Sequence, residues 1–368
     1  MKITVTRRQF LEAFADAACV APTRSSKPIL QSVLLRLADG EAVLVATDLE
    51  VGLRRRVLGV TADLAGSVVL PTAKFAAILR TSNDETLSIE AEGGQLIVRG
   101  LRSRHTLNTE DPALFPEMPG PDGKPTIVVI AAELRKMIRR TSWSTDLQST
   151  RYALGGCLFE AEAARLTAVG TDGRRLARMS VDADNSHPPG GTQPVIPVKA
   201  LKVIDRALTD DHWPVHVALR ENHALIETED AVVYTRLVVG RYPAYRDVFP
   251  AGAPSRATVE AGLLLAAVEQ SAILTSDESR GVVFDFTAGS LRMSSQAADV
   301  GSGEVELPIR LDGPDVSVTI DVRYLVDMLR AVEPAIVLSV EVIDHKNPAV
   351  FRCEDGYEYV VMPLTRDQ

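Results

Sequence analysis

Side chains that could bind a metal ion or act as nucleophiles are spread along the chain without forming a recognisable site. His212 and His216 are four residues apart, a spacing that suits a metal ion only on a helix, but Pro214 between them predicts a strand. The three cysteines are far apart and form no CxxC pair. We therefore expect no metal site and no cofactor, and the sparse, odd number of thiols is typical of the reducing cytoplasm.

One segment, GPDGKPT at 120–126, is similar to a phosphate-binding loop. Its spacing differs from GxxxxGK[ST], and Pro125 lacks the backbone N–H that a phosphate cradle needs. The chain also contains no GxSxG, HExxH or GxGxxG pattern. We interpret 120–126 as a linker and predict a binding or assembly protein that is not an enzyme. An uncharacterised enzyme with a site between repeats is the alternative.

Length and composition limit the class of protein further. The 368 residues suggest two or three domains, and 46% hydrophobic with 24% charged residues is ordinary for a globular protein. The apolar runs are far shorter than the roughly 20 residues of a membrane helix, so we expect no membrane partner. A net charge of −9 argues against a nucleic-acid binder that uses its whole surface, but leaves room for a basic patch.

Three kinds of segment recur in the same order. The first is a short strand followed by an amphipathic helix, repeated after about 124 and 129 residues. The second is a pair of alternating apolar strands joined by a Gly-containing turn, as at Asp39-Gly40. The third is a strand, a helix that starts at a Pro or an Asp, and a further hairpin. The helices of the third kind start at Pro71, Pro197 and Asp321.

These repeats predict an α+β protein of three similar domains, each with two helices laid on antiparallel sheets. Pro-rich stretches at 111–121 and 242–254 separate the repeats, and we expect them to be semi-rigid linkers. The predicted domains are 1–121, 122–252 and 253–368.

Charge is unevenly placed on the predicted elements. The six expected helices carry about +6 in total, whereas the whole chain carries −9. Because the helices of each unit share one face, this split predicts a basic helical surface and an acidic sheet surface.

Several motifs together point to a family. They are LVATDLE at 44–50, AVGTDGRRL at 168–176, GRYPAY at 240–245, SDESRG at 276–281 and YVVMPL at 359–364. With the triplication, they resemble the beta sliding clamps of bacterial DNA polymerase III over the whole chain. The resemblance implies DNA-clamp-type domains in a head-to-tail, ring-forming homodimer, a processivity factor that encircles double-stranded DNA without sequence specificity. The alternative is a clamp-like protein that binds partners without encircling DNA.

The resemblance also implies partners and a groove for their peptides between the second and third domains. The partners would be the DNA polymerase III alpha subunit, the clamp loader and other clamp-motif proteins. The groove would be formed by Leu154, Thr171, Gly173, Arg175, Leu176, Pro243, Val248, Tyr324, Val360, Met362, Pro363 and Leu364. Asp247 and Ser279 depart from the family pattern at its rim, so the preferred peptide motif stays open, as does the role of the residues after Leu364.

Two further surfaces follow from the resemblance. The DNA-facing candidates are Arg24, Lys27, Lys74, Gln148, Tyr152, Lys199 and Lys202. At the dimer interface, His105 and Leu107 would contact Ile273 and Leu274 of another copy. Arg102 and Arg104 could pair there with Glu304 and Glu306.

Overall fold

The computed structural model describes residues 1–121, 127–149, 153–162, 164–185, 193–276, 279–297 and 300–364. The chain divides into two compact units. Unit 1 consists of Met1–Arg135 and Ala183–Leu237, and unit 2 of Lys136–Asp182 and Val238–Gln368. The middle repeat therefore contributes strands to both units.

Unit 1 contains two antiparallel sheets. The five-stranded sheet has the order β5 (Val60–Leu64), β1 (Lys2–Thr6), β7 (Thr86–Glu92), β8 (Gln95–Arg99) and β9 (Arg104–Asn108). The nine-stranded sheet has the order β14 (Asp184–Asn185), β10 (Ile127–Ile130), β16 (Pro214–Leu219), β17 (His223–Glu227), β18 (Ala231–Arg236), β4 (Val51–Val57), β3 (Glu41–Thr47), β2 (Ser32–Ala38) and β6 (Gly66–Pro71). The short strand β15 (Val195–Pro197) precedes a helix of this unit.

Unit 2 repeats the plan. Its longer sheet runs through β11 (Gly156–Glu162), β12 (Arg165–Thr171), β13 (Arg175–Asp182), β27 (Tyr357–Val361), β26 (Ala349–Arg352), β25 (Val337–Val342), β19 (Ser255–Glu260) and β23 (Arg310–Asp312). Its four-stranded sheet has the order β22 (Gly301–Pro308), β21 (Ser290–Ala297), β20 (Gly281–Thr287) and β24 (Val316–Asp321). The antiparallel α+β class predicted from the repeats is confirmed.

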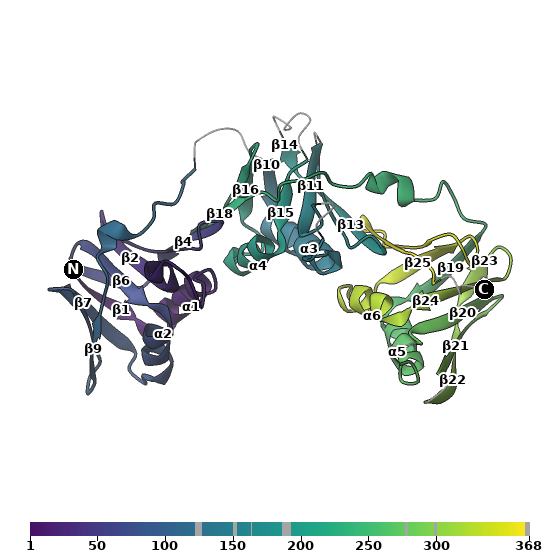
Figure 1. Cartoon of the computed structure of the whole chain (residues 1–368), viewed down its shortest axis with the longest axis horizontal. Coiled ribbons are helices and arrows are strands. Elements are labelled where there is room, and N and C mark those ends of the chain that lie inside the picture. The colour runs from purple at the N-terminus through teal and green to yellow at the C-terminus, as the bar shows by residue number, and fades with distance from the viewer. Residues whose placement is uncertain are drawn as a thin grey trace. The chain divides into compact units, whose positions relative to one another are not determined.

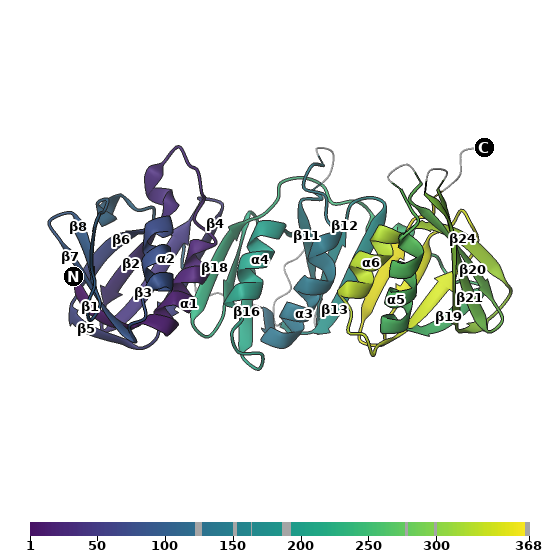
Figure 2. The same ribbon diagram turned by 90° about the horizontal axis from the view of Figure 1, so that it is seen from below.

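The described residues form six α-helices. They are α1 (Arg7–Ala18), α2 (Thr72–Thr81), α3 (Ala131–Thr141), α4 (Val198–Ala207), α5 (Ala261–Ala272) and α6 (Val322–Arg330). Within unit 1, α1 and α2 lie side by side, and within unit 2, α5 and α6 do the same (Figures 1 and 2). Phe10, Phe14 and Phe75 fill the space between α1 and α2, with ring centroids 5.0–6.4 Å apart. No helix in this part of the chain is long and apolar enough to cross a membrane.

The residues predicted to start helices lie at the N-termini of helices in the structure. Pro71, Pro197 and Asp321 are the N-cap residues of α2, α4 and α6. Asp321 accepts a hydrogen bond at 3.1 Å from the backbone N–H of Arg323, which satisfies one of the free donors at the helix start. The hairpin at Asp39 also forms, and its backbone takes a positive φ of 53°.

The Pro-rich stretches are packed more firmly than linkers. Phe115 and Met118, from the first stretch, are buried in a cluster with Leu34 and Val69 of unit 1. In the second stretch, Tyr242 is 1% exposed and donates a hydrogen bond to the Val169 carbonyl oxygen at 2.8 Å. The expectation of semi-rigid linkers was therefore incomplete, because apolar side chains between the prolines also anchor both stretches to the folded units.

Candidate functional site

An apolar groove lies in unit 2, where the turn between β12 and β13 meets the end of β27. Its cavity has a volume of about 180 Å³. The lining residues are Thr171, Gly173, Arg174, Arg175, Leu176, Pro243, Ala244, Tyr245, Val248, Val360 and Met362. Eight of the residues predicted for the groove are therefore brought together in one cavity.

The turn at the mouth of the groove is built by the Thr-Asp pair that recurs in the sequence. Thr171 Oγ1 accepts from the Gly173 N–H at 3.1 Å and donates to the Arg175 carbonyl at 2.6 Å. Asp172 accepts from the backbone N–H groups of Arg174 and Arg175, at 2.9 and 3.0 Å. Gly173 has a φ of 86°, a region that favours glycine.

The same turn is formed in the first repeat by Thr47 and Asp48. Thr47 Oγ1 donates to the Val51 carbonyl at 2.9 Å, and Asp48 accepts from the Glu50 and Val51 N–H groups. The repeated motif is thus explained by turn geometry, and in the second repeat the turn carries groove-lining side chains.

Arg175 is held in place by four partners. Its guanidinium lies over the rings of Trp143 and Tyr324, 4.9 and 4.6 Å from their centroids. It also donates to Asp172 at 3.0 Å and to Asp327 at 2.7 Å. Burial alone would lower the pKa of Arg175, but the hydrogen bond to Asp327 and the nearby negative charges raise it above its ordinary value. Arg175 therefore shapes the groove wall, and Tyr324 stands behind it.

The groove has a buried floor and an open rim. Leu176 and Val360 are 4% and 2% exposed, whereas Val248 and Met362 are 38% and 42% exposed. A large exposed methionine beside a buried aliphatic floor can adapt to an apolar side chain from another molecule. The arrangement is suited to binding an anchor residue.

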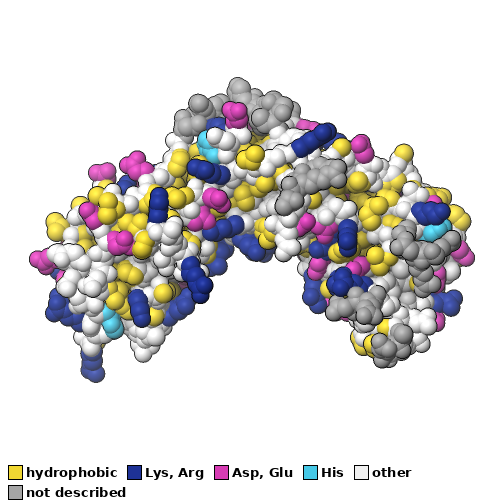
Figure 3. Space-filling model, in the orientation of Figure 1, with side chains coloured by type: hydrophobic (Ala, Val, Ile, Leu, Met, Phe, Trp, Pro, Cys, Tyr) yellow, Lys and Arg dark blue, Asp and Glu magenta, His cyan; other side chains and the backbone are white. Residues whose placement is uncertain are grey.

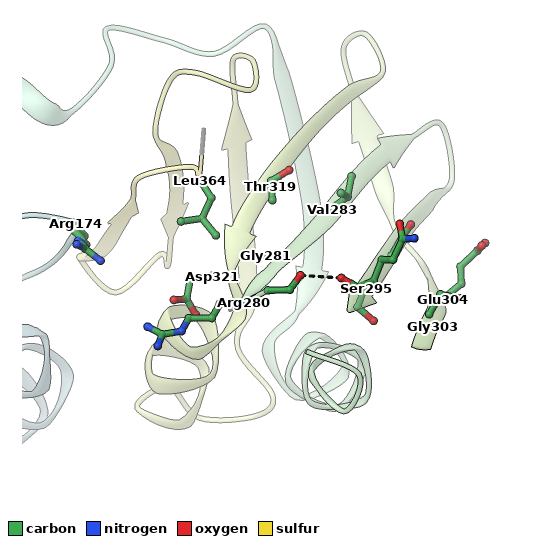
Figure 4. A pocket seen from close by; sticks show the side chains of 14 residues that line it. Arg174, Arg280, Gly281, Val283, Ser295, Gly303, Glu304, Thr319, Asp321 and Leu364 are labelled. Atoms are coloured by element: carbon green, nitrogen blue, oxygen red, sulfur yellow. Dashed lines mark hydrogen bonds between the residues drawn. The ribbon is translucent and has the colours of Figure 1, made fainter. Parts of the chain in front are cut away.

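Four predicted groove residues lie outside this cavity: Leu154, Tyr324, Pro363 and Leu364. Leu154 is a core residue, 5% exposed. Leu364 lines a separate, larger cavity of about 630 Å³ over the four-stranded sheet (Figure 4). The residues after Leu364 lie outside the described part of the chain.

Three lining residues were missed from the sequence: Arg174, Ala244 and Tyr245. Tyr245 is fixed by a hydrogen bond to Glu160 at 2.5 Å. Tyr245 belongs to the motif GRYPAY, so the sequence did contain a signal that pointed to it. Asp247, also expected near the rim, is exposed and does not line the cavity.

The candidate DNA-facing residues differ in how accessible their polar groups are. Arg24, Lys27, Lys74, Gln148 and Lys202 are exposed. In contrast, the Lys199 ammonium is bonded to Asp48. Burial would raise the pKa of Asp48, but the hydrogen bond from Lys199 and those from the backbone lower it overall. Tyr152 lies outside the described residues.

The simple charge count on the helices overestimated the basic surface. Arg140, counted on α3, is 1% exposed. Lys136 on α3 lies 2.6 Å from Asp355, and Lys199 on α4 is bonded to Asp48, two carboxylates outside the helices. Lys and Arg side chains still gather along the side of unit 1 that carries α1 and α4 (Figure 3). The exposed positive charge that has no acidic partner is therefore smaller than the predicted helix total. It is still concentrated beside the helices.

Two sheet edges carry the residues expected at a subunit interface. β9 is an edge strand of the five-stranded sheet, with His105 exposed and Leu107 half-buried. β22 is an edge strand of the four-stranded sheet. Beside β22, at the end of α5, Ile273 is 72% exposed, and Leu274 is half-buried.

The two edges have opposite charge. Arg102 and Arg104 are exposed at β9, and Glu304 and Glu306 are exposed on β22. Unpaired strand edges with complementary charges can pair between chains.

Comparisons with known proteins point to the same family along the whole chain. The N-terminal, central and C-terminal domain families of the DNA polymerase III beta subunit match residues 1–119, 129–244 and 246–365. The chain is 30% identical to the beta sliding clamp of Pseudomonas aeruginosa, with 99% of this chain and all of that protein covered. Identity to the Escherichia coli beta sliding clamp is also 30%, with the same coverage.

Solved structures are similar as well. A crystal structure of the DNA polymerase III subunit beta from Pseudomonas aeruginosa matches with a TM-score of 0.91 and 29% identity over the full length of both chains. The sliding clamp from Bacillus subtilis, at 21% identity and a TM-score of 0.92, has the same fold.

Proposed function

The chain belongs to the family of bacterial DNA polymerase III beta subunits, the beta sliding clamps, and we propose that two copies close head to tail into a ring around duplex DNA. It is a processivity subunit without catalytic activity, and its partners are DNA and a polymerase. We propose the domain borders 1–121, 122–252 and 253–368 and a cytoplasmic location. The observation that carries the ring is the presence of two charge-complementary sheet edges, β9 and β22.

Pairing of β9 with β22 of another copy would extend one sheet into the next. Such a contact joins two different surfaces of the protein. The copies therefore form a closed ring only if the rotation from one copy to the next brings the last copy back to the first. The backbone groups of both edges would gain hydrogen bonds, and Arg102 and Arg104 would face Glu304 and Glu306. Retention on circular but not on linear DNA tests the ring.

Ile273→Asp should break the dimer. Burying an isoleucine side chain contributes about 1.5–3 kcal/mol, and a carboxylate in its place adds a desolvation cost. Because Ile273 is 72% exposed, its replacement should leave the folded protomer intact. Sedimentation equilibrium across a dilution series should show a dissociation constant at least roughly tenfold higher than that of the wild type.

Leu263→Asp is the matched control for this variant. Leu263 is on α5, the helix that Ile273 caps at its C-terminal end, and is 52% exposed, but lies outside the proposed interface. An Ile273→Asp protein that stays as dimeric as Leu263→Asp would contradict the β9–β22 interface.

We propose that the groove binds a short peptide from each partner, including the polymerase III alpha subunit, the clamp loader and other clamp-motif proteins. The peptide would place a Leu or Phe side chain against Leu176 and Val360, under Met362. The support is the buried floor, the adaptable rim and the position of eight predicted residues in one cavity.

Met362→Ala should weaken such a peptide about tenfold, because the methionine covers part of the anchor side chain. Isothermal titration calorimetry with a peptide that contains Leu-Phe measures the affinity. Val337→Ala, which removes an exposed aliphatic side chain away from the groove, should leave the affinity unchanged. Equal affinities for the wild type and Met362→Ala would place the peptide elsewhere.

We propose that the exposed candidates Arg24, Lys27, Lys74, Gln148 and Lys202 face the DNA backbone. Contacts to phosphates carry no sequence information, which fits a protein that moves along DNA. Lys199 contributes only if its bond to Asp48 is exchanged for a phosphate.

A further inference from the structure

One wall of the apolar groove comes from a segment between β18 and β19 that lies outside the sheets. Four of the eleven lining residues belong to it: Pro243, Ala244, Tyr245 and Val248. Tyr245 and Val248 are the two ends of a short 3-10 helix, η4 (Tyr245–Val248). The floor of the groove is different, because Leu176 is held by the backbone ladders of β13 with β12 and β27. The position of the η4 wall must therefore depend on side-chain contacts.

The hydroxyl group of Tyr245 joins η4 to the sheet. Tyr245 is 5% exposed, and its hydroxyl donates to Glu160 on β11 at 2.5 Å. The Arg246 guanidinium donates to the same hydroxyl oxygen at 3.3 Å and to Glu160 at 2.9 Å. Burial and the hydrogen bond to Glu160 raise the pKa of Tyr245, so the hydroxyl keeps the proton that it donates. These three groups form a closed set of hydrogen bonds between η4 and β11.

The charged members of this set lie nearer to the solvent than the tyrosine. The side chains of Glu160 and Arg246 are 20% and 64% exposed. Arg246 also lies 3.8 Å from Glu162. If the tyrosine hydroxyl is removed, Glu160 and Arg246 still pair with each other, so no buried charge is left without a partner. The hydroxyl can therefore be tested without disrupting the fold.

Movement of the Tyr245 end of η4 would be transmitted to the groove rim. Backbone N–H groups within the segment bond to its own carbonyls: Asp247 to Ala244 at 3.2 Å, and Phe249 to Arg246 at 3.4 Å. The turn therefore behaves as one short, locally bonded piece. Val248, at its far end, is 38% exposed and faces a floor that is nearly buried.

On the premise that the groove binds partner peptides, we propose that Tyr245 is a positioning residue whose hydroxyl holds η4 where Val248 meets the anchor side chain. With Glu160 and Arg246 holding the tyrosine, the wall is in place before a peptide arrives. Binding then loses less conformational freedom than it would with an unfixed wall. Tyr245 raises the affinity for every peptide that uses the groove and does not select among them.

Tyr245→Phe should weaken the binding of an acetylated and amidated Leu-Phe peptide about fivefold, because the wall must then be ordered during binding. Isothermal titration calorimetry with the full-length protein measures this affinity. Glu160→Gln keeps an acceptor oxygen for the hydroxyl and should bind within about twofold of the wild type. Glu160→Leu removes the acceptor and should resemble Tyr245→Phe.

A double-mutant cycle distinguishes positioning from a general loss of stability. If Tyr245 acts through Val248, the effect of Tyr245→Phe should fall below about twofold in a Val248→Ala background. Two effects that arose independently would instead add.

Tyr242→Phe is the matched control. Tyr242 is 1% exposed in the same stretch, and its hydroxyl donates to the Val169 carbonyl at 2.8 Å. It precedes η4 and lies outside the groove lining. The variant also loses a buried hydrogen bond, but its peptide affinity should stay within about twofold of the wild type.

Equal affinities of the wild type and Tyr245→Phe would overturn this proposal and leave the groove standing. An equal loss in Tyr242→Phe, or a full loss from Tyr245→Phe in the Val248→Ala background, would also overturn it. The hydroxyl would then act through the stability of the whole stretch. If the wild type bound no peptide, the proposed groove would fall, and this role of Tyr245 with it.

Discussion

Once a clamp loader has placed the protein on a circular plasmid, it will remain bound during gel filtration at high salt, and linearising the plasmid will release it. A closed ring is held by topology, so its loss requires either a DNA end or an opened protein interface. A protein held only by phosphate contacts would instead dissociate as salt rises, because each neutralised phosphate releases counterions. The measured quantity is the fraction of protein that elutes with circular and with linear DNA.

Variants separate topology from contact in this experiment. Lys74→Glu and Lys202→Glu should weaken direct DNA binding but leave retention on circles nearly intact, because both side chains are exposed and outside the proposed interface. Lys199→Glu is unsuitable, since it would place two carboxylates together at Asp48 and could destabilise the fold. Ile273→Asp should not be retained on circular DNA either. Equal retention of the wild type on circular and linear DNA would mean that it grips DNA rather than encircling it.

Much of the fold was accessible from the sequence because its signals are local. Alternating apolar strands around a turn such as Asp39-Gly40, and helices that start at Pro71, Pro197 or Asp321, need only neighbouring residues to be recognised. The threefold recurrence then strengthened each assignment.

Pairing between repeats was not accessible in the same way. β4 pairs with β18 in unit 1, and β13 pairs with β27 in unit 2, so strands of different repeats share one sheet. The residue pattern of a strand can indicate that the strand lies at the edge of its repeat. It does not identify the strand of another repeat that pairs with that edge. For the same reason, a charge count along the helices could not reveal that Arg140 and Lys199 have tertiary partners.

The structure brings together some of the residues named by resemblance and separates others. Thr171, Leu176 and Met362 line one cavity, because their positions depend on a turn and a strand end that the repeats preserve. Leu364 instead lines the larger cavity over the four-stranded sheet, where its backbone N–H donates to the Thr319 carbonyl on β24 at 2.8 Å. Arg174 was not predicted, because it lines both cavities, a property that only the folded chain displays.

A buried ion-pair cluster around Arg140 should contribute strongly to the stability of unit 2. Arg140 on α3 is 1% exposed, and it donates to Asp355 at 2.8 Å and is bonded to Glu333. Its guanidinium also lies over the ring of Tyr357, 5.4 Å from the centroid. The cluster ties α3 to the turn before β27, the strand that ends at the groove.

Arg140→Met should lower the free energy of unfolding of unit 2 by about 2–3 kcal/mol, because it removes the buried guanidinium that both carboxylates share. The value is below that for a fully buried pair, since Asp355 and Glu333 are 29% and 62% exposed. Urea unfolding can be followed by the fluorescence of Trp143 in a Trp213→Phe background. Arg330→Met, which breaks the exposed pair with Glu269, should cost less than about 1 kcal/mol.

The loss of stability caused by Arg140→Met should depend on pH in a defined direction. Burial would raise the pKa of Asp355, but the hydrogen bond from Lys136 and the charge of Arg140 hold it below its ordinary value of 3.8. For Glu333, burial also acts upward, and its backbone hydrogen bond and Arg140 bring the pKa below 4.5. A carboxylate with a lowered folded pKa stabilises the protein above its unfolded pKa and loses that contribution as pH falls through the folded value. The difference between wild type and Arg140→Met should therefore be full at pH 7 and shrink below about pH 4, and a difference that grew on acidification would contradict the assigned role of the cluster.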